Sequence, residues 1–217
     1  MVYYALIKYA PSEPHFRYIV AAPDPETIDE WWRVVSEKPG VQWNRLAPDY
    51  YSFSHNPVWD SAPEFNNRLM YSFLNDRDFR FTGAFAQQPR TDHISGQTFF
   101  IRSKSSPYIY WAVKDGRIYA SRFSRTRFRI KIEGEVKPKV MIGKDSISIT
   151  LTTNSAQYVS IRSNGELSVE GGGSAGGILF SHFKKGFLAD SYEIGDDVNA
   201  AVRRVGNDDG EEWELVQ

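Results

Sequence analysis

The stretch "FFIRSKSSPYIYWAVKDGRIYASR", residues 99–122, contains three short runs of strand-forming residues separated by turns. Aromatic and β-branched residues fill these runs, as is typical of strands. The sequence "KDG" at residues 114–116 lies between the second and third runs and is a hairpin signal. The stretch therefore predicts one strand followed by a β-hairpin.

The same order of elements recurs later in the chain. Residues 149–171, "ITLTTNSAQYVSIRSNGELSVEG", repeat it, with Tyr158 opening the second run and "SNG" forming the turn. Residues 187–205, "FLADSYEIGDDVNAAVRRV", are a weaker third copy. Each copy can be closed by a run with an aromatic residue: "TRFRIKI" at 126–132, "GILFSHFKK" at 177–185 and "EEWELVQ" at 211–217. Internal repeats of short strands predict a sandwich or a barrel built from three similar units.

These three units resemble the β-trefoil superfamily, most closely its ricin-B-like and fascin-like members. In that family the closing strand carries an aromatic residue that packs in the barrel, and Phe128, Phe180 and Trp213 occupy that position here. The Gln-x-Trp signature of ricin-like lectins is absent, since "EEW" at 211–213 only approximates it, so no sugar-binding residue is transferred from the family. The resemblance implies a non-catalytic, lectin-like protein that binds carbohydrate through its loops. Fold alone does not establish function.

Residues 1–91 have a different pattern. "VYYALIKY" at 2–9 and "FRYIVAA" at 16–22 indicate strands, and Asp24 followed by Pro25 indicates the start of a helix that ends at "KPG", residues 38–40. The spacing of Phe65, Leu69 and Phe73 predicts a second helix within residues 61–79. Residues 41–60 are predicted to be an aromatic, turn-rich connection. The expected fold class is α+β, with an N-terminal α+β region (1–91, two helices) packed on an all-β, β-trefoil-like region (92–217).

Charge is unevenly distributed along the second region. The formal net charge is +7 over residues 92–145 and −6 over residues 146–217. In "RTRFRIKI", residues 125–132, basic side chains occupy every second position, as on the solvent face of a strand. The basic row is either neutralised by acidic residues later in the chain or forms a patch that attracts an anion. The candidate ligand-binding residues are Arg125, Arg127, Arg129, Trp111, Tyr158 and His93.

No motif in the sequence identifies a catalytic or metal site. The four histidines, at positions 15, 55, 93 and 182, match no metalloprotease or triad pattern. Asp196, Asp197, Asp208 and Asp209 do not match a calcium loop, and the glycine-rich residues 171–177 lack the ending of a phosphate-binding loop. We therefore predict no catalytic residue, no metal and no cofactor. Two alternatives remain open: a cytosolic protease inhibitor of the cysteine-free trefoil type, or an enzyme with a pocket between the two regions that uses His93 or His55.

Composition limits the cellular setting and the partners. The absence of cysteine excludes disulfides and thiolate chemistry and favours a reducing compartment. No signal peptide and no membrane-spanning segment is recognisable, so a cytoplasmic protein is expected. The expected partner is a glycan or another anionic or polar small ligand, with another protein as an alternative and nucleic acid disfavoured.

Overall fold

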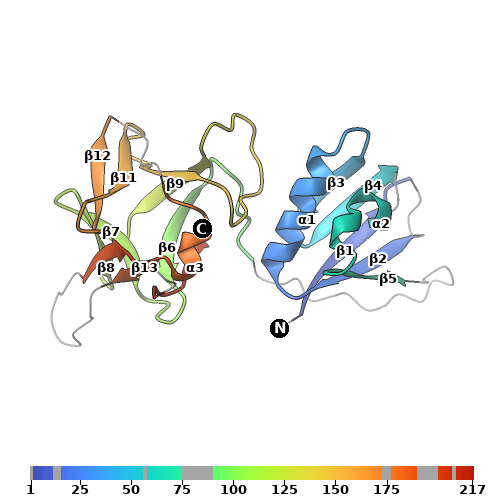
Figure 1. The fold of residues 1–217 in the computed structure, drawn as a ribbon, viewed down its shortest axis with the longest axis horizontal. Helices are drawn as coiled ribbons and strands as arrows, with labels where there is room; N and C mark the ends of the chain where they lie inside the picture. Colours follow the sequence, from blue (N-terminus) through green and yellow to red (C-terminus); the bar gives the residue numbers. More distant parts are fainter. Residues whose placement is uncertain are drawn as a thin grey trace. The chain divides into compact units, whose positions relative to one another are not determined.

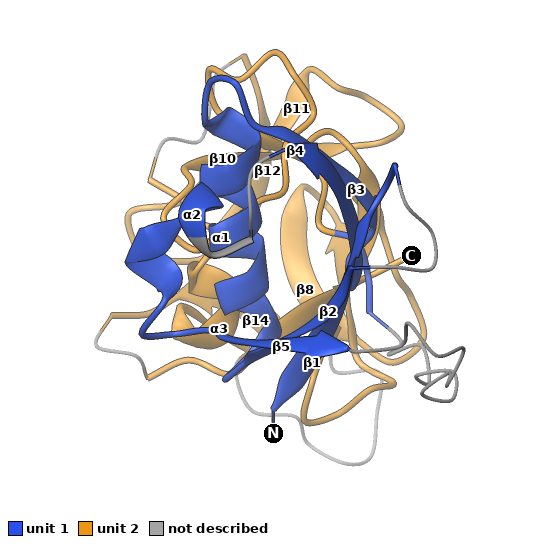
Figure 2. Cartoon of the chain, turned by 90° about the vertical axis from the view of Figure 1, so that its right-hand side faces the viewer, with its two compact units in different colours: residues 1–92 blue, residues 93–217 orange. Residues whose placement is uncertain are grey.

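The computed structural model describes residues 2–11, 16–55, 58–74, 90–172, 177–189, 200–206 and 209–217. The chain forms two compact units, residues 1–92 and 93–217, drawn in different colours in Figure 2. This division lies one residue from the boundary that the sequence suggested. Each unit has a hydrophobic core of its own.

Unit 1, residues 1–92, is built around a five-stranded sheet with the strand order β3-β4-β1-β2-β5. Neighbouring strands are antiparallel except β1 and β4, which are parallel. The strands are β1 (Tyr3–Tyr9), β2 (Arg17–Ala22), β3 (Gln42–Ala47), β4 (Tyr50–His55) and β5 (Met70–Leu74).

Helix α1 (Pro25–Glu37) connects β2 to β3 and contacts the sheet of unit 1 (Figure 1). It begins where the sequence predicted, because the Asp24 carboxylate accepts a 2.8 Å hydrogen bond from the backbone N–H of Thr27, and Pro25 occupies the first turn. Ile28, Trp31 and Val35 are fully buried at helical spacing. This one apolar face of α1 is what joins the helix to the sheet.

The second predicted helix, within residues 61–79, is wrong. In the described part of that range the chain forms the end of α2 (Val58–Ser61), the 3₁₀ turn η1 (Pro63–Phe65) and strand β5. Phe65 and Leu69 are buried, but Phe73 is 42% exposed on β5. Pairing with β2 satisfies the backbone groups of residues 70–74, and this long-range gain outweighs the helical spacing of three apolar residues.

The predicted connection, residues 41–60, contains strands β3 and β4. Trp43 and Phe53 are buried cross-strand partners on the two strands, and Pro48 with Asp49 forms the turn between them. The alternating inward positions of Trp43 and Arg45 are the strand signal. Turn-forming residues on both sides obscured it in the sequence.

Unit 2, residues 93–217, contains a closed seven-stranded antiparallel barrel. Around the barrel the strand order is β6-β7-β8-β12-β11-β10-β9, and β9 pairs with β6. These strands are β6 (Thr98–Ser103), β7 (Tyr110–Lys114), β8 (Arg117–Ser121), β9 (Arg127–Ile132), β10 (Ile147–Leu151), β11 (Gln157–Ile161) and β12 (Leu167–Gly171). Strand β13 (Phe187–Ala189) pairs with β14 (Ala200–Arg204), β14 pairs with β8, and β15 (Trp213–Val216) pairs with β6.

One strand from each repeated unit meets the other two at one place. Strands β8, β12 and β14 belong to the first, second and third sequence repeats, respectively. Ser168 pairs with Arg117, Ala200 pairs with Ala120, and an isolated bridge joins Glu166 to Arg203. These pairings bring together one strand from each of the three segments that were compared in the sequence.

Aromatic side chains fill the core of unit 2. Phe128 is fully buried and Trp213 is 3% exposed, while Phe180 is partly buried and packs against the same core. Trp111 is fully buried, and its ring centroid lies 5.1 Å from that of Phe187 and 5.7 Å from that of Trp213. Burying such large rings makes this cluster a major source of stability.

The expected α+β fold class was wrong. The described residues are 48% strand and 12% helix, with a closed barrel in one unit and a separate sheet in the other. Strand pairing replaces helix in residues 70–74, and two strands occupy the predicted connection. In the opposite sense, the short helix α3 (His182–Lys185) occupies part of the closing run that was expected to be a strand within residues 177–185. No helix within the described ranges has the length and apolar character needed to cross a membrane.

Candidate functional site

Strand β9 presents its basic row to solvent. Arg127, Arg129 and Lys131 are exposed, and the intervening Phe128, Ile130 and Ile132 are buried. Successive strand residues point to opposite faces, so the barrel core holds the apolar residues and leaves the charges outside. This part of the sequence reading agrees with the structure residue by residue.

The arginines around β9 are stacked on aromatic rings. The guanidinium carbons of Arg125 and Arg127 lie 4.6 and 4.7 Å from the centroid of the Phe100 ring, and that of Arg125 lies 5.7 Å from Tyr110. Arg122 lies 4.7 Å from the ring of Tyr108. Stacking restrains a guanidinium while leaving its N–H edge available for hydrogen bonds. We call these six residues the arginine–aromatic surface.

Acidic residues on β15 and immediately before it pair with basic neighbours of this surface. Arg102 forms a 2.6 Å ion pair with Glu214, and Lys104 forms a 2.7 Å pair with Glu212. Among the residues that the structure describes, no ion pair involves the basic residues of the surface and its extension along β9: Arg122, Arg125, Arg127, Arg129 and Lys131. The positive charge of this row is therefore not cancelled by the described acidic residues.

The six predicted ligand-binding residues do not form one site. Arg129 is paired with Thr150 on β10, and Thr150 is paired with Tyr158 on β11. Tyr158 therefore lies two strands away from the basic row. Trp111 has no exposed surface and offers no ring face to a ligand. The half-buried His93 ring contacts Phe180, with ring centroids 5.5 Å apart.

Sequence reasoning missed the aromatic half of the surface and one exposed ring beside it. Phe123, two residues before Arg125, is 80% exposed, and Tyr108 is 55% exposed. Phe100 follows the buried Phe99 on β6, and strand alternation alone places it on the outer face. The register of β6 against β9, which sets Phe100 opposite Arg127, is a tertiary feature.

A buried charge network lies inside unit 1. Arg90 donates to one oxygen of Asp29 on α1, while Arg45 on β3 lies 3.7 Å from the other oxygen and 2.6 Å from Asp92. Burial raises the pKa of Asp29 to about 6, against the lowering effect of Arg90 and Arg45. Burial also raises the pKa of Tyr51. The network joins α1, β3 and residues 90–92, so its first role is structural.

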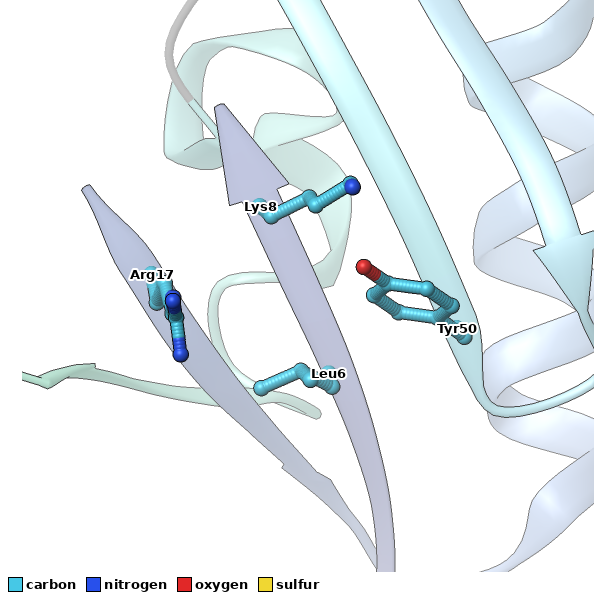
Figure 3. Close-up of a pocket in the computed structure, with 4 residues that line it drawn as sticks. All are labelled: Leu6, Lys8, Arg17 and Tyr50. Carbon is cyan, nitrogen blue, oxygen red and sulfur yellow. The ribbon is translucent and has the colours of Figure 1, made fainter. Parts of the chain in front are cut away.

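A pocket of about 180 Å³ lies on the sheet of unit 1 and is lined by Leu6, Lys8, Arg17 and Tyr50 (Figure 3). The Lys8 ammonium is 5.6 Å from the centroid of the Tyr50 ring, and the Tyr50 hydroxyl points toward it. The pocket thus combines two cations, a phenol and an aliphatic side chain. None of these residues was singled out from the sequence.

The histidines and carboxylates of the described residues are candidate metal ligands by residue type. No three of the described His, Asp and Glu side chains are placed to hold a metal ion. His55 is exposed at the end of β4, and Asp92 pairs with Arg45. Burial and the nearby Arg204 lower the pKa of His182, whose Nδ1 accepts from the backbone N–H of Leu179 at 3.1 Å. His15, Asp196, Asp197, Asp208 and residues 173–176 of the glycine-rich segment lie outside the described residues.

Comparison with known proteins gives no relative from which to transfer a role. No family model, no curated protein and no solved structure matches this chain.

Proposed function

We propose that the chain is a non-catalytic binding protein that recognises an anionic carbohydrate through the arginine–aromatic surface of unit 2. Sulfate or carboxylate groups of the glycan accept hydrogen bonds from the guanidinium edges of Arg122, Arg125 and Arg127. A sugar ring packs against the exposed ring of Phe123. Arginine is suited to this task because its planar donor groups match the oxygens of such anions.

One observation carries the proposal: Arg125 and Arg127 both stack on Phe100 and form no ion pair within the described ranges. Like charges held close together disfavour one another, and a bound anion relieves that repulsion. Because the rings already restrain the guanidinium groups, less side-chain entropy is lost when a ligand binds. The surface therefore has both charge and preorganisation.

The pairing of the repeats supports a carbohydrate ligand by analogy. The three sequence repeats, the mutual pairing of β8, β12 and β14, and the buried Phe128 and Trp213 of two closing runs support a β-trefoil-like unit, whereas the closing run that contains Phe180 forms a turn and α3. Lectin-type trefoils bind sugars, and this is the family that the repeats resemble. One fold serves many functions, so this analogy supports a carbohydrate ligand less strongly than the geometry of the arginine–aromatic surface does.

A glycan fits the surface better than a nucleic acid does. Proteins that bind single strands present open aromatic faces on which bases stack. Here the rings of Phe100, Tyr110 and Tyr108 are occupied by guanidinium groups, so the surface presents donor edges more than open rings. Donor edges suit scattered sulfate and carboxylate groups.

Binding of dextran sulfate, measured by isothermal titration calorimetry beside uncharged dextran of equal length, tests the proposal. We expect saturable binding of dextran sulfate that weakens steeply as salt rises, because exposed charges are screened. The double variant Arg125→Ala/Arg127→Ala is expected to weaken binding by at least about tenfold, equivalent to about 1.4 kcal/mol.

The matched control is Lys114→Ala/Arg117→Ala, which removes two exposed positive charges from the β7–β8 hairpin instead. Equal losses in both double variants would mean that net charge alone attracts the polymer and would refute a specific site. Tighter binding of a single-stranded oligonucleotide than of dextran sulfate would replace the glycan with a nucleic acid as the ligand.

A further inference from the structure

The pocket of unit 1 lies on the sheet face opposite α1. Along β1, Ala5 and Ile7 are buried in the same core as Trp31 of α1. Leu6 and Lys8 alternate with them and therefore point to the other face. The pocket is thus separate from the buried network of Asp29 and its arginines.

The polar groups of the pocket lie on three adjacent strands, β2, β1 and β4. Lys8 on β1 and Arg17 on β2 are direct cross-strand partners, and Leu6 on β1 is the partner of Tyr50 on β4. Figure 3 shows Leu6 between Arg17 and Tyr50, with Lys8 beside the Tyr50 hydroxyl. The strands therefore hold two positive charges and a hydroxyl around one small space.

We propose that this pocket binds a phosphomonoester with a small apolar substituent. Lys8, Arg17 and the Tyr50 hydroxyl donate hydrogen bonds to the phosphate oxygens, and Leu6 contacts the apolar part. Two cations and a phenol hydroxyl on three adjacent strands match the several acceptor oxygens of a phosphate dianion. Arginine and lysine are the usual protein partners of phosphate.

The size of the pocket sets the size of the ligand. Its volume of about 180 Å³ is below the roughly 300–1,000 Å³ of pockets that enclose drug-sized ligands. It therefore accommodates a phosphate group and a short apolar substituent, and the remainder of a larger ligand extends into solvent.

Phenyl phosphate is the probe, added to the full-length chain and followed by ¹H–¹⁵N NMR. We expect saturable shifts of the amide signals of Leu6, Lys8, Arg17 and Tyr50. Lys8→Ala and Arg17→Ala are each expected to weaken binding by about ten- to hundredfold, because each removes a charge-assisted hydrogen bond to the phosphate. Tyr50→Phe, which keeps the ring, is expected to weaken it by about two- to tenfold.

The inference would be overturned by no saturable shift at these four residues, by unchanged binding in Lys8→Ala/Arg17→Ala, or by equal binding of phenol, which lacks the anion. Benzoate that binds as tightly as phenyl phosphate would also overturn it, in favour of a carboxylate ligand. Arg125→Ala/Arg127→Ala is the control for the other unit. Its binding of phenyl phosphate is expected to be unchanged, so this site and the glycan site succeed or fail separately.

Discussion

Arg127 and Phe100 are cross-strand partners on β9 and β6, and the guanidinium carbon of Arg127 lies 4.7 Å from the centroid of the Phe100 ring. Arg125 shares the same ring at 4.6 Å. One aromatic side chain therefore positions two positive charges. This relationship makes Phe100, rather than the buried Trp111, the residue on which the proposed glycan site depends.

Replacing Phe100 with leucine is expected to weaken binding of dextran sulfate without unfolding the chain. An exposed cation–π contact contributes about 0.5–1 kcal/mol, so the loss of two predicts about a five- to thirtyfold weaker complex. Titration calorimetry measures the affinity, and a thermal melt verifies the fold. Unchanged affinity in a folded variant would show that the ring does not prepare the arginines for binding.

The basic row itself is expected to contribute little to stability. Arg127→Ala and Arg129→Ala each remove an exposed side chain, and neither residue forms an ion pair within the described ranges. Such surface changes usually alter the free energy of unfolding by no more than about 0.5 kcal/mol, and the contact of Arg127 with Phe100 adds at most about 1 kcal/mol. Calorimetric melts of both variants should lie within a few degrees of the parent chain. A large loss would mean that these arginines hold acidic partners from elsewhere in the chain.

Phe128, between those arginines, is expected to behave in the opposite way. It is fully buried, and its ring centroid lies 6.3 Å from that of Trp111. Phe128→Ala should cost about 3–5 kcal/mol because it removes apolar contacts and leaves a cavity. Phe123→Ala is the matched control, since that ring is 80% exposed. Chemical denaturation of both variants compares the two positions, and similar losses would contradict the register assigned to β9.

Much of unit 2 was predictable because its information is local. Alternation in "RFRIKI" assigns the inner and outer faces of β9, and the run "TRFRIKI" at 126–132 contains the observed strand, Arg127–Ile132. The turn at Asp115 and Gly116 has positive φ at both residues, 51° and 73°, which is the backbone that an Asp-Gly hairpin turn needs. Such signals depend on neighbours in the sequence, so they survive without knowledge of the tertiary structure.

The wrong or missing predictions concern segments whose structure depends on pairing with residues distant in the sequence. Residues 70–74 belong to a segment whose apolar spacing is compatible with a helix, but they pair with the edge of β2 and form strand β5. The pocket depends on three strands brought together by the fold, and Lys8 and Arg17 are nine positions apart in the sequence with no motif between them. The stacking of two arginines on Phe100 depends in the same way on the pairing of β6 with β9. Candidate sites of this kind can be predicted only when the pairing and register of the strands are known.

The buried guanidinium of Arg45 gives a further stability prediction. The side chain of Arg45 is 8% exposed and lies 2.6 Å from the partly exposed Asp92 and 3.7 Å from the buried Asp29. Arg45→Ala should cost about 3 kcal/mol, because it leaves the buried carboxylate of Asp29 without one of its two cations. Glu37→Gln, in the exposed pair with Arg33 on α1, should cost less than about 1 kcal/mol. Denaturation of unit 1 measures both, and a neutral Arg45→Ala would argue that water replaces the guanidinium.

Asp29 is expected to make the stability of unit 1 depend on pH. Its pKa is about 6 in the folded chain, because burial disfavours the charged form, and about 3.9 in an unfolded chain. Between these values the folded state keeps the proton that the unfolded state has released, so acid favours folding. The contribution of Asp29 is complete below about pH 4 and is lost as pH rises through 6, by up to about 3 kcal/mol. Urea denaturation across this range measures it.

Asp29→Asn isolates this effect from other titrating groups. The variant cannot ionise at this position. The free energy of unfolding of the parent, relative to that of the variant, should therefore fall as pH rises from 4 to 7. Arg90 faces the carboxylate from residues 90–92, Arg45 from β3, and the phenols of Tyr3 and Tyr51 from β1 and β4, so all remain in the variant. A difference that instead moves in favour of the parent would mean that the two arginines outweigh burial and hold the pKa of Asp29 below its ordinary value.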